Sequence, residues 1–285
     1  MTLAELYFID VGQGDCTLMV DSLSRAALIV DCPSHAANRI AAFLRTNNLH
    51  LAAVLVTHWD RDHYGGVARL ARSFLPPQVF YNHDTLFPEP PYGRSGIRST
   101  LKTFLNLPPG SLNPAAYPAS GSVGSIKWRL LAPTHAEISS AYVKGRRNEA
   151  SAVVEVLVGN VRILIGGDAV ASTWSRLLSS GLGQASVLRW PHHGAELHGD
   201  PTLSIAKKLL SSTNPDATIV SVGAENTYAH PHLGVISAAA SVSEVACTQR
   251  TSGCSGCPAS GHTYCGSSLL MQVFTLRHTL KPTVV

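Results

Sequence analysis

Residues 57–66 of the chain read THWDRDHYGG. This stretch follows the apolar run LAAVLV, residues 51–56, which we expect to form a buried strand. Four side chains able to bind a metal lie within six positions of this stretch, namely His58, Asp60, Asp62 and His63. Crowded carboxylates repel one another, as do crowded imidazoles when they are protonated, and a metal cation that both residue types bind removes that repulsion. Because strand ends are where rigid scaffolds present functional side chains, the stretch predicts a metal centre there.

Outward from this stretch, apolar runs with strand character alternate with segments of helical spacing. We expect strands at residues 6–11, 16–20, 26–32, 51–56, 126–131, 152–158, 161–166, 186–190 and 217–222. We expect helices at residues 36–47, 67–74, 169–179 and 202–211. Residues 83–125, rich in Pro, Gly and Ser, are predicted to be a long loop with one short helix at 97–105. The pattern predicts an α/β fold with two mixed sheets covered by outer helices.

Composition narrows the class of protein. Apolar residues make up 45% of the 285 residues and charged residues 14%, which excludes a disordered chain. The net charge of +4 slightly favours a phosphate-bearing substrate but is too small to identify nucleic-acid binding. The N-terminus has no basic segment followed by an apolar one, and no apolar run reaches about 18 residues. We therefore expect a cytoplasmic protein that does not cross a membrane.

THWDRDHYGG resembles the H-x-[HD]-x-D-H-x-G-G signature of the metallo-β-lactamase superfamily. The aspartate at its third position resembles the ComEC-type branch, the soluble hydrolase domain of competence DNA-uptake proteins and its free-standing relatives. Further elements of that branch are resembled, in the expected order, by FIDVGQGDC (8–16), NEASAVV (148–154), ILIGGDA (163–169), LRWPHHG (188–194) and SVGAENTYAHPH (221–232). The resemblance covers roughly residues 5–240. It implies a four-layer αββα sandwich, with residues 1–285 forming one domain.

The resemblance also implies two divalent metal ions, zinc or manganese. His58 and Asp60 would belong to the first ion, Asp62 and His63 to the second, and Asp168 would bridge them. His192 would complete the second set. Where the family usually places a third histidine for the first ion, this chain has Asn148, a weak amide ligand at best. Because oxygen-rich ligand sets favour harder ions, we expect activity with Mn²⁺ or Mg²⁺ at least equal to that with Zn²⁺.

The implied chemistry is hydrolysis by a water that two cations bridge and deprotonate, with Asp62 among the catalytic residues. Candidates for binding the scissile group or protonating the leaving group are His193, Tyr228, His230 and His232. For Tyr228 the alternative is a buried phenol in the core. Arg146 and Arg147 are candidates for holding a phosphate, although at least one of them is expected on the solvated surface. Asp10 and Asp15 are interpreted as turn-forming residues, and Asp31 as a brace for the loops of the site.

Four late cysteines, Cys247, Cys254, Cys257 and Cys265, have the spacing C-x6-C-x2-C-x7-C. The spacing predicts a structural zinc ion in a Cys-rich insertion at about residues 247–265, with disulfides or free thiols as alternatives. The ComEC-type pattern does not carry this cluster.

These features favour a two-metal phosphodiesterase or nuclease that acts on nucleic acid or on a phosphorylated small molecule. A first alternative is a hydrolase of esters, lactones or β-lactams, which in this superfamily usually has a histidine-rich first site that Asp60 and Asn148 do not supply. A second alternative is a non-catalytic metal-binding module, against which the complete set of six ligands argues.

Overall fold

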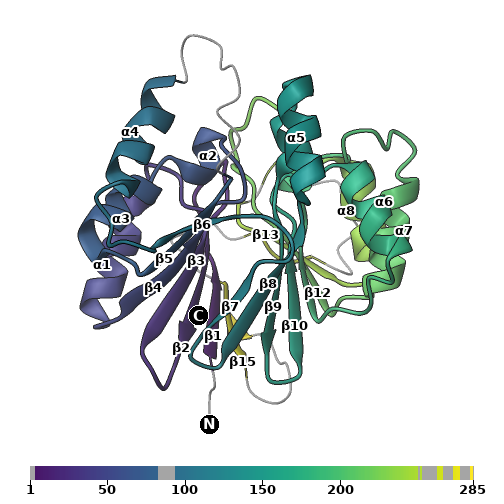
Figure 1. Cartoon of the computed structure of the whole chain (residues 1–285). Helices are drawn as coiled ribbons and strands as arrows, with labels where there is room; N and C mark the ends of the chain where they lie inside the picture. The colour runs from purple at the N-terminus through teal and green to yellow at the C-terminus, as the bar shows by residue number, and fades with distance from the viewer. Residues whose placement is uncertain are drawn as a thin grey trace.

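The computed structural model describes residues 4–82, 94–249 and 251, together with the strands at 262–265, 272–276 and 283–284. Two sheets, each with eight strands, face one another, and helices cover their outer faces (Figure 1). The predicted four-layer α/β sandwich is thereby confirmed.

The first sheet has the strand order β16-β15-β1-β2-β3-β4-β5-β6. Its strands are β1 (Ala4–Phe8), β2 (Thr17–Asp21), β3 (Ala26–Val30), β4 (His50–Leu55), β5 (Gln78–Tyr81), β6 (Leu112–Pro114), β15 (Gln272–Leu276) and β16 (Thr283–Val284). Strands β3 to β6 are parallel, whereas β1 and β2 pair antiparallel with their neighbours. The helices beside this sheet are α1 (Ala37–Thr46), α3 (Val67–Phe74) and α4 (Arg94–Phe104) (Figure 1).

The second sheet has the strand order β14-β13-β12-β11-β10-β9-β8-β7. Its strands are β7 (Ser120–Val123), β8 (Ile126–Ala132), β9 (Val153–Val158), β10 (Val161–Ile165), β11 (Val187–Arg189), β12 (Ala217–Val220), β13 (Glu244–Cys247) and β14 (His262–Cys265). Strands β7 to β10 are antiparallel and β10 to β14 are parallel. The helices on its outer side are α6 (Ala171–Ser179), α7 (Ser204–Thr213) and α8 (Leu233–Ala240) (Figure 1).

The central strands are apolar on both faces because each sheet is buried on both sides. Strand β3 shows this clearly, since all five of its residues are buried. Its Ala27 and Ile29 side chains pack with the helices, whereas Leu28 and Val30 pack between the two sheets. This two-sided burial explains why the sequence shows continuous apolar runs rather than alternation.

The predicted short helix at residues 97–105 is confirmed as α4 (Arg94–Phe104). The rest of the predicted loop at residues 83–125 is wrong in part, because it contains the short strands β6 and β7. Both strands lie at the edge of a sheet, and sequences as short and polar as SGSV carry little strand signal. Residues 83–93 lie outside the described part of the chain.

Helix α5 (His135–Lys144) is an element that the sequence analysis missed. Its start carries a capping box, in which Thr134 and Glu137 satisfy each other's backbone N–H groups. Its end is marked by Gly145 at a φ of 66°, a left-handed conformation that glycine adopts readily. Across the ranges that the structure describes, no helix combines the length and the apolar character needed to span a bilayer.

Candidate metal centre

The predicted ligands come together at one end of the sandwich. His58 and Asp60 lie in the loop after β4, and Asp62 and His63 lie in the one-turn helix α2 (Arg61–Tyr64). Asp168 follows β10, and His192 and His193 follow β11 in the 3-10 turn η2 (His192–Gly194). The centre is therefore assembled from strand ends of both sheets, as expected for a site on a rigid scaffold.

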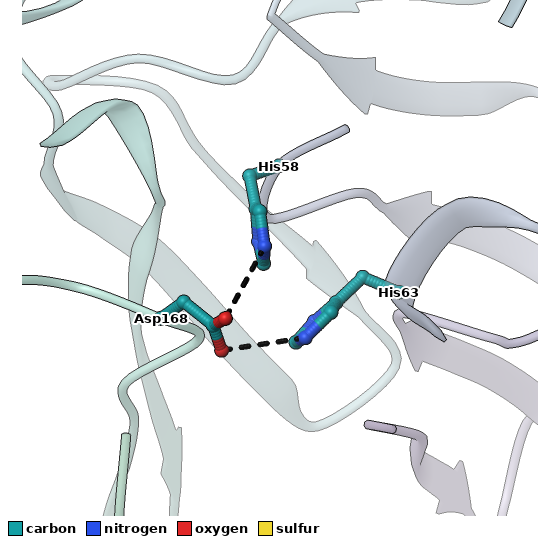
Figure 2. Close-up of side chains that lie close together, drawn as sticks. All are labelled: His58, His63 and Asp168. Atoms are coloured by element: carbon teal, nitrogen blue, oxygen red, sulfur yellow. Dashed lines mark ion pairs between the residues drawn. The ribbon is translucent and has the colours of Figure 1, made fainter. Parts of the chain in front are cut away.

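Asp168 lies at the middle of this cluster. Its Oδ2 is 3.5 Å from His58 Nε2, and its Oδ1 is 3.3 Å from His63 Nε2 (Figure 2). Both imidazoles point toward the carboxylate (Figure 2). One atom from each of these three residues lies within 4.8 Å of the other two, which is a spacing that a shared metal ion can fill.

A second group of three ligands shares His63 and adds Asp62 and His193. His193 Nε2 is 3.3 Å from Asp62 Oδ2 and 3.9 Å from Asp168 Oδ1. His192, the residue predicted to complete this set, has its Nε2 3.7 Å from Asp168 Oδ2 and is less buried. The structure thus places His193, and not His192, beside Asp62 and His63.

The reason for this difference lies in the backbone of η2. His192 and His193 have φ values of 52° and 56°, a left-handed conformation that non-glycine residues rarely adopt. Two consecutive residues of this kind cost about 1–3 kcal/mol each and are found mainly at functional sites. Sequence spacing cannot tell which of two adjacent histidines such a turn directs inward.

Four buried polar atoms of the cluster have no hydrogen-bond partner among the residues that the structure describes. They are His58 Nε2, His63 Nε2, Asp168 Oδ1 and His193 Nε2. Each such atom costs roughly 1–3 kcal/mol when left unsatisfied. Because all four belong to the two groups of potential ligands, their donor chemistry fits divalent cations.

Asp31 fixes the orientation of His63. The Asp31 carboxylate lies 2.8 Å from His63 Nδ1 and accepts hydrogen bonds from the Thr57 amide and hydroxyl at 2.8 and 2.6 Å. With Nδ1 bound to this carboxylate, Nε2 faces the centre, which is the arrangement usual for metal-ligating histidines. The interpretation of Asp31 as a brace for the loops of the site is confirmed.

Asp15 does more than shape a turn, so that interpretation is wrong. Its Oδ1 is 2.9 Å from Arg189 Nη2 and 3.4 Å from His193 Nδ1. Both Asp15 and Arg189 are buried, and the Ser221 carbonyl lies 3.0 Å from the same His193 nitrogen. Arg189, a single cation in an apolar strand, is a residue that the sequence analysis did not single out. Asp10, by contrast, accepts the Gly12 amide at 2.9 Å and forms the expected turn.

Within the cluster, the aspartates and the histidines stabilise each other's charged forms. Burial alone would raise the pKa of Asp168, but the His63 and His58 imidazoles hold it well below its usual range. Burial lowers the pKa of His58, whereas Asp168 and Asp60 outweigh this effect and raise it to about 9. Burial likewise lowers the pKa of His193, and Asp15 and Asp62 raise it to about 10. A divalent cation that binds here must displace the protons of these histidines.

Asp60 and the neighbouring arginines form the other side of the centre. Asp60 Oδ2 is 3.4 Å from His58 Nε2, and Asp60 Oδ1 accepts a hydrogen bond of 2.7 Å from Arg147 Nη1. Arg147 begins the 3-10 turn η1 (Arg147–Ala150), which also carries the half-buried Asn148. Arg146 pairs instead with Glu149 at 3.0 Å on the surface. The structure thus separates the two arginines, as the sequence analysis expected for at least one of them.

A pocket of about 410 Å³ opens over the cluster. Its lining includes Asp60, Asp62, Arg147, Asp168, His192, His193, Tyr228 and His230. Tyr228 is 67% exposed and stacks on His230 with ring centroids 5.6 Å apart, so it is not a core phenol. Burial and the neighbouring His192 lower the pKa of His230 to about 4. His232 lies outside this lining, and its Nε2 is 3.1 Å from Glu196 Oε1.

The late cysteines are described only in part. Cys247 ends β13, and its backbone is in register with Cys265 of the neighbouring parallel strand β14. Cys254 and Cys257 lie outside the described residues. The structural zinc ion therefore stays a prediction.

Residues 8–223 match the Metallo-beta-lactamase superfamily. The chain belongs to this superfamily. As a member, it is 26% identical over 234 residues to Recombination protein 2 of Haemophilus influenzae, covering 80% of the chain and 25% of that protein. It is 35% identical over 75 residues to the Lactamase-like protein nscB of Arthroderma benhamiae, covering 26% of the chain and 16% of that protein. The matched segments thus span a quarter or less of these two relatives.

Among solved structures, the fold is similar to that of YhfI from Bacillus subtilis, described as a metallo-beta-lactamase fold protein. The TM-score is 0.51 at 14% identity, with 86% of this chain and 95% of that chain covered. At this identity the similarity supports the fold alone.

Proposed function

We propose that this metallo-hydrolase cleaves phosphodiester bonds, in nucleic acid or in a phosphorylated small molecule, with divalent metal ions. The observation that carries the proposal is the convergence of four unsatisfied buried ligand atoms beneath a pocket that also presents the Arg147 guanidinium. The buried atoms suit divalent cations, and a guanidinium suits a phosphate group. The pocket therefore combines the two kinds of positive charge that a phosphodiester requires.

The chain's own residues would hold two ions. Asp62, His63 and His193 would hold one ion, His58 and Asp60 the other, and Asp168 would reach both. When bound, such ions lower the pKa of a water molecule and neutralise charge that develops on phosphate oxygens. Because the set contains three carboxylates, we expect Mn²⁺ or Mg²⁺ to support activity at least as well as Zn²⁺.

The surrounding residues orient the ligands and the substrate. Asp31 holds His63, and Asp15 together with the Ser221 carbonyl holds His193, each through the ring nitrogen that faces away from the centre. Arg147, which lines the pocket, would bind a phosphate oxygen. His230, whose lowered pKa keeps its ring neutral at pH 7, can accept a proton or a hydrogen bond at the mouth of the pocket.

The similarity to a relative named for recombination supports a ComEC-like branch and a nucleic-acid substrate. A second candidate function is hydrolysis of an ester, lactone or β-lactam, which the similarity to a relative named as lactamase-like favours. Asp60 and Asn148 argue against this second candidate, because they leave the first position with few imidazole ligands.

A substrate panel tests the proposal. Bis-p-nitrophenyl phosphate, single-stranded DNA and nitrocefin are each incubated with the protein in Mn²⁺, Mg²⁺ or Zn²⁺, and EDTA serves as the control. We expect metal-dependent cleavage of the diester or the DNA, which Asp168→Asn abolishes and Asp21→Asn, a change at the distant end of β2, leaves intact. Cleavage of nitrocefin alone would favour the second candidate. Metal binding without any hydrolysis would favour the non-catalytic module.

A further inference from the structure

The ligand cluster has two halves, one with His58 and Asp60 and the other with Asp62, His63, His193 and Asp168. The two halves differ in the side chains that neutralise the charge of their carboxylates. Asp60 is bound by a guanidinium, since Arg147 Nη1 donates to its Oδ1 over 2.7 Å. Its second oxygen, Oδ2, is 3.4 Å from His58 Nε2. The carboxylate therefore has no oxygen that faces a cation without competition.

The other half has no such competitor. Among the described residues, the ion pairs of Asp62 and Asp168 are with histidines, and no arginine or lysine forms an ion pair with either carboxylate. A histidine can itself become a metal ligand, whereas a guanidinium cannot and keeps its charge at all ordinary pH values. A divalent ion can thus bind beside Asp62 together with the neighbouring imidazoles, but beside Asp60 it must displace a fixed positive charge.

Asn148 is an independent reason to expect weaker metal binding near His58 and Asp60 than near Asp62. It lies next to Arg147 in η1, where the family resemblance led us to expect a histidine ligand. A neutral amide is a weaker ligand for a transition-metal ion than an imidazole or a carboxylate. Beyond His58, Asp60 and the shared Asp168, this position therefore lacks a further strong ligand, and it also carries a competing cation.

We propose that Arg147 makes the two metal positions unequal, so that one ion binds tightly at Asp62, His63, His193 and Asp168 and a second binds weakly at His58 and Asp60. The second ion is recruited by an anionic substrate. Arg147, Asp60 and Asp168 line the same pocket, so a phosphate oxygen that enters it can accept from the guanidinium in place of Asp60. Asp60 is then released to bind the second ion. This substrate-linked step rests on the proposed function, whereas the inequality of the two positions does not.

Binding of Mn²⁺ to chelator-stripped protein, followed by titration calorimetry and by electron paramagnetic resonance, tests the inequality. We expect one tight equivalent and a second that binds at least about ten-fold more weakly. Arg147→Ala is expected to narrow this gap by about ten-fold or more. Arg146→Ala, which removes the adjacent arginine paired with Glu149, is the matched control and should leave the gap unchanged. If Arg147→Ala does not fold, Arg147→Gln carries the same expectation.

Dimethyl phosphate, a stable diester, tests the recruitment step. It should strengthen binding of the second Mn²⁺ in the unaltered protein and have little effect in Arg147→Ala. Two equivalents of equal affinity in the unaltered protein, or an unchanged gap in both Arg147 variants, would overturn the inequality. An unchanged gap on addition of dimethyl phosphate would overturn the recruitment. Failure of the proposed function would show instead as absent diester cleavage with the metal affinities as described.

Discussion

Two buried aspartates at opposite ends of the sandwich, Asp21 and Asp168, show what separates a structural carboxylate from a ligand. Asp21 ends β2, and its two oxygens accept four hydrogen bonds of 2.6–2.9 Å from the amides and hydroxyls of Ser24 and Ser125. Asp168 lies in the loop after β10, and its Oδ1 has no donor among the described residues. Its neighbours are imidazoles at 3.3–3.9 Å. The Asp21 carboxylate thus has donors at both of its oxygens, whereas the Asp168 carboxylate keeps an oxygen available to bind a metal ion.

The two ends also differ in what they connect. Asp21 belongs to the first sheet, and Ser125 lies in the turn between β7 and β8 of the second sheet. The contact closes one end of the sandwich with neutral donors, which need no further partner. At the other end, ligands from both sheets leave buried atoms unsatisfied. At the metal centre, the unsatisfied buried atoms lower the stability of the fold but keep a binding site. At the other end, the hydrogen bonds of Asp21 stabilise the fold.

The largest effect on the metal centre is expected from Asp168→Ala. Removal of the carboxylate that lies near both groups of ligands should lower the affinity for Mn²⁺ by more than about 100-fold, since loss of supporting residues alone costs 10–100-fold. Equilibrium dialysis of chelator-stripped protein measures this affinity. Asp21→Ala is the control. An equal loss of Mn²⁺ affinity in both variants would contradict the distinction between Asp168 as a ligand and Asp21 as a structural carboxylate.

A smaller effect is expected from Asp31→Asn, which weakens the support of His63 but keeps every ligand. We expect Mn²⁺ affinity to fall by about 10–100-fold while the fold persists. Asp10→Asn, a change in the turn near Gly12, should leave the affinity as it is. If calorimetry gave equal Mn²⁺ affinities for the two variants, Asp31 would have no role in supporting His63 as a ligand.

No effect on metal affinity is expected from Asp21→Asn, which acts on stability instead. Burial would raise the pKa of Asp21, but the hydrogen bonds from Ser125 and Ser24 lower it to about 2 from an unfolded value of 3.8. A folded pKa below the unfolded one stabilises the protein above about pH 4, and this contribution of about 2 kcal/mol is lost as the pH falls toward 2. Urea unfolding of both proteins between pH 7 and 2 should show the loss in the parent and a flatter curve in Asp21→Asn. Parallel curves would contradict the assignment.

The comparison also explains what the sequence could predict. The apolar runs and the spacing of His58, Asp60, Asp62 and His63 are local signals, and they were sufficient to predict the sandwich and the clustering of these side chains after a strand end. Contacts between distant segments have no such signal. The pairing of Arg147 with Asp60, 87 residues apart, and that of Arg189 with Asp15 depend on the folded chain.

Three other features, a turn, a helix and two edge strands, are local in the chain but were not predicted. The choice between His192 and His193 depends on a left-handed turn that spacing does not encode. Helix α5 was missed although Thr134 and Glu137 form a recognisable capping box, so a local signal was available there. The edge strands β6 and β7 are too short and polar for their patterns to predict pairing.

The most direct test of the account is the number of divalent ions that the folded chain binds. Chelator-stripped protein is dialysed against micromolar Mn²⁺, and the metal is counted by mass spectrometry in the parent and in His63→Ala, which removes the imidazole shared by both groups of ligands. We expect at least one equivalent in the parent and substantially less in the variant. A folded parent that retains no Mn²⁺, Mg²⁺ or Zn²⁺ even at millimolar concentrations would show that the cluster is not a metal centre.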